Sequence, residues 1–118
     1  MALKRIIRPT SDARDEESFA TPEDAWVWYS QCQRARDEGA RYRAGNGDVA
    51  RPCAPDDIAR EVRRLYRRRI LRGAHLRALA RFGGENGVVV GDGDAAGRLW
   101  REALDRLGTP LRAKGIVA

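Results

Sequence analysis

The chain has 118 residues, with 23 Lys and Arg against 17 Asp and Glu, so its formal net charge is +6 and its isoelectric point is about 10.1. This length fits one domain, and the 42% hydrophobic content excludes a fully disordered chain. No apolar run approaches the ~18 residues of a membrane-spanning helix.

The positive charge is concentrated in the middle third of the chain. Residues 51–82 contain ten Arg and three acidic residues, which gives +7. Residues 1–50, with 8 basic and 9 acidic groups, sum to −1, and residues 83–118, with 5 of each, sum to 0. Arg makes up 21 of the 23 basic residues, a bias that a GC-rich genome also produces. Such a bias does not segregate charge, so the middle third is the candidate binding region.

Residues 1–20 show neither helical nor strand periodicity and predict a flexible N-terminal arm. An arm that docks on a partner or on DNA phosphates is the alternative. We expect residues 21–118 to form a single helical domain. Only Ile6 and Ile7 lie between Arg5 and Arg8, too few for a secretory signal, so the expected location is cytoplasmic.

The first helix should begin at Thr21, whose hydroxyl can cap it, and Gly39 can end it. Its large aromatic side chains are expected to anchor the core rather than to stack on bases. They are Trp26, Trp28 and Tyr29. Residues 40–54 form a connection, in which the Gly-Asn-Gly-Asp run at 45–48 is also compatible with a short hairpin.

A second helix should start near Pro55 and carry one apolar stripe. The stripe consists of Ile58, Val62, Leu65 and Tyr66. Its phase slips after residue 70, so we expect a break between Ile70 and Gly73. A third, short helix should then begin near Ala74 and stop at the glycine pair 83–84.

Residues 83–93 predict a loop, in which three Val at 88–90 also allow a short β-arm. Asp94 should cap a fourth helix that Gly108 ends, and the apolar Ile116 and Val117 should dock on the core. The predicted fold class is mainly α: a small single-domain bundle of about four helices with a possible short β-arm or hairpin.

Residues 55–83 loosely resemble a helix-turn-helix, in which the second helix enters the DNA major groove. The compact form of that unit fails in its first half, because Arg68, Arg69 and Arg72 fall where apolar residues belong. On the looser form, the predicted nucleic-acid-binding residues are Arg60, Arg63, Arg64, Arg67, Arg68, His75, Arg77 and Arg81. Those of the second helix would contact phosphates. His75, Arg77 and Arg81 would approach base edges.

The leading functional hypothesis is therefore a small DNA-binding or regulatory protein, for which a homodimer would add specificity. The alternative is a non-enzymatic adaptor that binds an acidic protein through the same Arg-rich surface. A third interpretation is a solvated face that binds nothing. For His75, a capping or half-buried role competes with the groove-facing one.

We do not expect an enzyme, a cofactor or a metal site. His75 is the single His, and Cys32 and Cys53 lack the spacing of metal ligands, so both should be reduced thiols. The glycine-rich run at 91–97 lacks the Gly-Lys-Ser/Thr ending of a phosphate-binding loop.

From about residue 21 onward the chain resembles small bacterial proteins of GC-rich genomes that have no established activity. The segments that carry this resemblance are Pro52–Ile58, Leu99–Ala103 and Leu111–Val117. It implies a compact small-protein family and transfers no functional residues.

Overall fold

The computed structural model describes residues 16–39, 50–84 and 94–118. They form four α-helices: α2 (Pro22–Asp37), α3 (Pro55–Arg67), α4 (Gly73–Gly84) and α5 (Ala95–Ala113). The described residues contain no strand, only isolated bridges between Glu16 and Ala50 and between Phe19 and Val117. The mainly helical prediction is confirmed. The hairpin at 45–48 and the β-arm at 88–90 lie outside the described residues.

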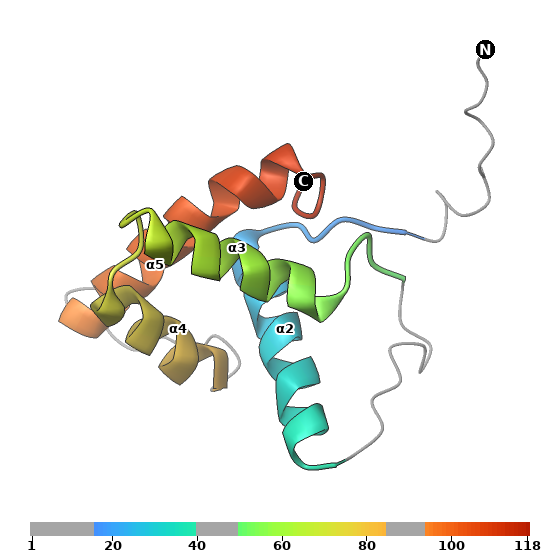
Figure 1. The fold of residues 1–118 in the computed structure, drawn as a ribbon, viewed down its shortest axis with the longest axis horizontal. Helices are drawn as coiled ribbons and strands as arrows, with labels where there is room; N and C mark the ends of the chain where they lie inside the picture. The colour runs from blue at the N-terminus through green and yellow to red at the C-terminus, as the bar shows by residue number, and fades with distance from the viewer. Residues whose placement is uncertain (1–15, 40–49, 85–93) are drawn as a thin grey trace.

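Helix α5 is the centre of the packing. It lies against α4, and both contact α2, while α3 packs on α2 and α5 (Figure 1). The apolar stripe of α5 is almost fully buried, and it includes Trp100, Ala103, Leu107 and Leu111. Ile116 and Val117 are buried with it, as predicted. Trp26 is buried, and Trp28 and Tyr29 pack against the same core.

Three predicted helix starts are confirmed by local hydrogen bonds. The backbone N–H of Asp24 donates to Thr21 Oγ1 at 3.1 Å, which caps α2. The N–H of Ala96 donates to Asp94 Oδ1 at 3.0 Å, which caps α5. At Pro55, the N–H of Ala54 donates to Asp57 Oδ2 at 2.9 Å. Each bond satisfies a group that a helix end leaves free.

The predicted end of the last helix at Gly108 is wrong, because α5 continues through Pro110 to Ala113. Gly108 serves close packing instead: a Cβ there would lie 2.8 Å from Cγ of Pro22. Local sequence makes glycine a stop signal, but here the reason for glycine is a neighbour 86 positions away in the chain.

The N-terminal boundary at residue 21 must also move. Phe19 is only 2% exposed, and its ring lies 5.2 Å from that of Trp28. The N–H of Phe19 donates to Ile116 O, and the N–H of Ala118 donates to Phe19 O, both at 2.9 Å. Residues 16–20 therefore belong to the domain rather than to a flexible arm; residues 1–15 lie outside the described part.

Candidate functional site

The turn between α3 and α4 (residues 68–72, the α3–α4 turn) closes α3 with two backbone hydrogen bonds. The N–H of Arg69 donates to Tyr66 O at 3.0 Å, and the N–H of Ile70 donates to Leu65 O at 2.9 Å. This is the pattern of a Schellman motif, which needs a left-handed residue and usually has glycine there. Here Arg69 takes that conformation, with φ +63°, the one non-glycine residue with positive φ in the described chain.

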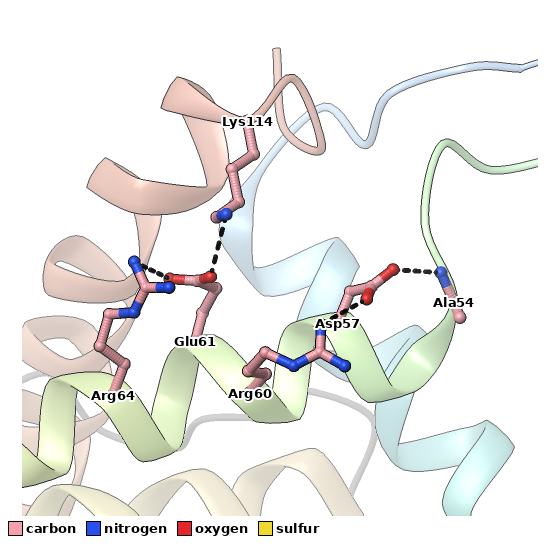
Figure 2. Close-up of polar contacts among 6 residues, drawn as sticks. All are labelled: Ala54, Asp57, Arg60, Glu61, Arg64 and Lys114. Atoms are coloured by element: carbon pink, nitrogen blue, oxygen red, sulfur yellow. Dashed lines mark hydrogen bonds and ion pairs between the residues drawn. The ribbon is translucent and has the colours of Figure 1, made fainter.

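Arginines are dense on both sides of this turn. No acidic residue occurs between positions 62 and 84, whereas eight Arg do. Within α3 the acidic residues lie upstream, in its first two turns (Figure 2), and α5 brings Glu102 and Asp105 close to the arginines of this region. Arg60 pairs with Asp57 at 2.9 Å, so this predicted phosphate contact is already partly neutralised.

Glu61 is a buried carboxylate, only 2% exposed, that holds α3 to the end of α5 (Figure 2). Its Oε2 lies 3.3 Å from Lys114 Nζ, and its Oε1 lies 3.8 Å from Arg64 Nη1 without accepting a hydrogen bond. Buried carboxylates require such compensation, because desolvation penalises the charge. Arg64 therefore partly neutralises a buried carboxylate of the fold, and its charge is not fully available to a ligand.

The remaining arginines of this region are exposed and form no ion pair with any described residue. They are Arg63, Arg67, Arg68, Arg69, Arg72 and Arg77. Arg81 is also exposed, and its guanidinium lies 4.9 Å from the ring centre of the neighbouring Phe82. The unpaired charge thus gathers at the end of α3, in the turn and at the start of α4.

Two open pockets bring these arginines together with α5. One, of about 350 Å³, lies between α3 and α5 and is bordered by Arg64, Arg68 and Arg106 and by the carboxylates of Glu61 and Asp105. The other, of about 590 Å³, lies between the turn, α4 and α5 and is bordered by Arg69, Arg72 and Arg106. Ile70 lines both pockets. We call the five arginines around them the basic surface: Arg64, Arg68, Arg69, Arg72 and Arg106.

Arg106 links the two pockets and fixes their geometry. Its Nη1 donates to the carbonyl of Ile70 at 3.1 Å, which ties the side chain to the α3–α4 turn. Nη1 also lies 3.4 Å from His75 Nε2, and the guanidinium has further N–H donors on Nε and Nη2 at the junction of the pockets. The basic surface is therefore concave and formed by two parts of the chain.

His75 does not face a DNA groove, so the prediction that it approaches base edges is wrong. It is 3% exposed, and its Nδ1 accepts the backbone N–H of Arg72 at 3.0 Å at the start of α4. Nε2 therefore carries the proton of the neutral ring and donates to Glu102 Oε1 at 3.0 Å. This hydrogen bond holds the pKa of Glu102 below its usual range. The capping alternative for His75 is confirmed.

The helix-turn-helix comparison is also limited by packing. The break between α3 and α4 falls where the stripe loses phase, as predicted. In such a unit the two helices pack on each other. Here the main helix contacts are those of α5 with α4, α3 and α2, and of α2 with α3 and α4. Arg77 and Arg81 remain on the exposed side of α4, away from the pockets.

Three residues of the basic surface escaped the sequence prediction: Arg69, Arg72 and Arg106. The first two were visible as the arginines that spoil a compact helix-turn-helix, which is a signal for surface exposure. Arg106 carries no such signal, since it lies 34 residues beyond Arg72 and reaches the turn only through packing of α5.

Comparison with protein-family models, curated proteins and solved structures finds no match. None of the described helices is both long and apolar enough to cross a membrane. Within the described ranges, no group of three or more His, Cys, Asp or Glu is placed to hold a metal ion. Neither Cys32 nor Cys53 is in a disulfide, and burial raises the pKa of Cys53 to about 11, which opposes thiolate formation.

Proposed function

We propose that this protein binds the phosphate backbone of nucleic acid, with duplex DNA as the expected target, through the basic surface. The observation that carries the proposal is that Arg68, Arg69 and Arg72, which form no ion pair with a described residue, lie around two pockets that share Arg106. Arg recognises phosphate through a planar fork that donates two parallel hydrogen bonds. An arginine without an internal acidic partner can make these bonds without first breaking an ion pair.

The outer line of α3 extends this surface. Arg60, Arg63 and Arg67 recur at helical spacing on its exposed side, and the latter two have no ion pair among the described residues. Phosphates along one strand could therefore contact α3 and the α3–α4 turn in succession. This mode reads the backbone and does not require α4 to enter the groove.

The conformation of Arg69 supports the same proposal. A left-handed backbone costs an L-residue with a Cβ roughly 1 kcal/mol relative to glycine. Strained residues of this kind concentrate at functional sites. An arginine at a position that favours glycine is consistent with a requirement for its side chain.

Fluorescence anisotropy with a random-sequence duplex, titrated with salt, tests the proposal. The affinity should fall steeply with salt, because each neutralised phosphate contributes a slope of ~0.9 in log K against log salt. Changing Arg68, Arg69 and Arg72 together to Gln should weaken binding at ~50 mM salt by at least ~10²-fold and reduce the slope by up to ~3. The matched control changes Arg34, Arg36 and Arg112 to Gln, which removes equal charge elsewhere.

If the two triple variants lose equal affinity for duplex, binding depends on the net charge of the protein and not on the basic surface. If neither duplex nor single strands bind at ~50 mM salt, nucleic-acid binding is rejected. An acidic protein would then be the remaining partner for this surface, detectable with a polyglutamate peptide as the probe.

A further inference from the structure

The larger pocket of the basic surface is an open hollow that gathers more kinds of side chain than backbone binding requires. It has a volume of about 590 Å³ and lies where the α3–α4 turn and the start of α4 meet the middle of α5. Ala74 and Leu99 contribute apolar wall, and the polar lining residues are Arg69, Arg72, His75, Glu102 and Arg106. A phosphodiester on the outside of a duplex could be bound by an exposed line of arginines alone.

The charges within the pocket sum to about two positive units. Glu102 offsets Arg106, and both groups are fixed by the contacts already described. His75 adds no charge in the tautomer in which its Nδ1 accepts the N–H of Arg72. Arg69 and Arg72 are left over, each without an ion pair among the described residues.

Two uncompensated guanidinium groups at one pocket match a dianion. A phosphodiester carries a single negative charge, whereas a phosphomonoester carries close to two at pH 7 and offers three acceptor oxygens. Arg106, tethered through one nitrogen to Ile70 O, can add donors from the α5 side. Glu102 opposes an anion, but the hydrogen bond from His75 occupies its Oε1.

From this arrangement we infer that the pocket binds a phosphomonoester, such as the 5′-phosphate at the end of a nucleic-acid strand. The inference rests on the proposed nucleic-acid binding for its biological source, but the pocket chemistry is the same for a free nucleotide. Arg69 and Arg72 bind the phosphate oxygens, while Arg63 and Arg67 contact the backbone that leads away from the end.

The test compares two duplexes that differ in one group: a 5′-phosphate or a 5′-hydroxyl, each labelled at the 3′ end. The full-length protein should bind the phosphorylated duplex on the order of 10-fold more tightly, as expected for new charge-assisted hydrogen bonds. Arg69→Gln with Arg72→Gln should abolish this preference. Arg63→Gln with Arg67→Gln removes equal charge and should weaken both duplexes while keeping the preference.

Two results would overturn the inference, and they are distinguishable. If both duplexes bind with equal affinity, the phosphomonoester pocket is rejected while nucleic-acid binding stands. If neither duplex binds, the proposed function falls, and thermal unfolding with adenosine 5′-monophosphate against adenosine decides on the pocket alone. Stabilisation by the nucleotide that depends on Arg69 and Arg72 supports a free-nucleotide site, and no stabilisation rejects it.

Discussion

Helices α3 and α5 end in the same hydrogen-bonded turn but differ at the two positions that stabilise such turns. After α5, the N–H groups of Ile116 and Val117 both donate to Leu111 O, and Gly115 takes the left-handed conformation at φ +78°. After α3, Ile70 and Leu71 donate in the same way to Leu65 O, but the left-handed residue is Arg69.

The following apolar residue differs as well. Ile116 is 3% exposed, so it makes the hydrophobic contact that usually accompanies this motif, whereas Ile70 is 36% exposed. The end of α5 therefore has the residues that favour folding at both positions. The end of α3 has a strained arginine and an exposed isoleucine, in the middle of the unpaired charge. The residues of the α3–α4 turn are therefore not those that would make the fold most stable. We propose that binding accounts for them.

The largest effect is expected where the two helix ends are joined. Lys114 precedes Gly115 and pairs with buried Glu61 of α3. Lys114→Met leaves that carboxylate with Arg64 alone and should lower the free energy of unfolding by about 2 kcal/mol, less than for a fully buried pair because Lys114 is half exposed. Urea denaturation measures the loss. The double variant with Glu61→Met should recover most of it, since no buried charge then remains.

Arg112→Met is the matched control, because it removes a cation from the last turn of α5 that has no ion pair with Glu61. A loss equal to that of Lys114→Met would mean that the helix dipole, and not Glu61, explains the effect.

Giving α5 the residue of α3 should reproduce the strain. Gly115→Arg should lower the free energy of unfolding by about 1–2 kcal/mol, because the backbone is left-handed there. A Cβ at this position meets no atom within 4 Å, so the cost comes from the backbone and not from a clash. Gly84→Arg is the control: it also has open space but lies in α4 without positive φ, and it should be close to neutral. Similar losses at both sites would assign the effect to added charge.

The reverse exchange should stabilise the protein at the expense of binding. Arg69→Gly should raise the free energy of unfolding by about 1 kcal/mol. Arg69→Ala removes the same charge but keeps the strained Cβ, so it should gain less. Both variants should lose the same affinity for duplex, which anisotropy measures. A glycine variant that is no more stable than the alanine one would remove the strain argument, whatever happens to binding.

Much of the fold followed from local sequence. Helix starts at Thr21 and Asp94 depend on side chains bonding to amides two or three residues away, and the break before α4 follows from a slip in apolar phase. Gly108 and Phe19 were misassigned because their roles are set by distant partners, Pro22 and Ile116. From local sequence alone, Gly108 predicts the end of a helix. Phe19, a lone aromatic residue in a polar stretch, predicts no packing at all.

The candidate site was predicted only as a charged segment. The sequence locates the charged residues but does not tell which of them form ion pairs. Glu61, for example, pairs with Lys114, which lies 53 positions away in the chain. It also gives no reason to expect an arginine in a left-handed conformation, because the usual signal for that conformation is glycine. His75 was assigned to the groove because a helix start is normally exposed, whereas the packing of α5 brings Glu102 over it.

The smallest effect concerns the start of α3, where the carboxylate of Asp57 accepts a hydrogen bond from the backbone N–H of Ala54. Hydrogen bonding from the N–H of Ala54 lowers the pKa of Asp57, and the ion pair with Arg60 adds to this. A depressed folded-state pKa means that the carboxylate stabilises the fold above its unfolded pKa of 3.8 and loses this effect as pH falls through the folded value. Asp57→Ala should therefore cost about 0.5 kcal/mol at pH 7, a modest value for a largely exposed group.

Thermal unfolding at several pH values checks this, and the gap between Asp57→Ala and the parent protein should narrow below about pH 4. Asp56→Ala is the control, since it removes the same charge from the same turn and its ion pair with Arg36 is longer, at 3.4 Å. If both variants lose equal stability at every pH, the hydrogen bond from Ala54 to Asp57 is not the cause of the loss. The start of α3 would then be no better stabilised by its side chains than the end at Arg69. A loss specific to Asp57 would instead show that side chains stabilise the start of α3. The unfavourable residue, Arg69, would then be confined to the end of α3 that borders the basic surface.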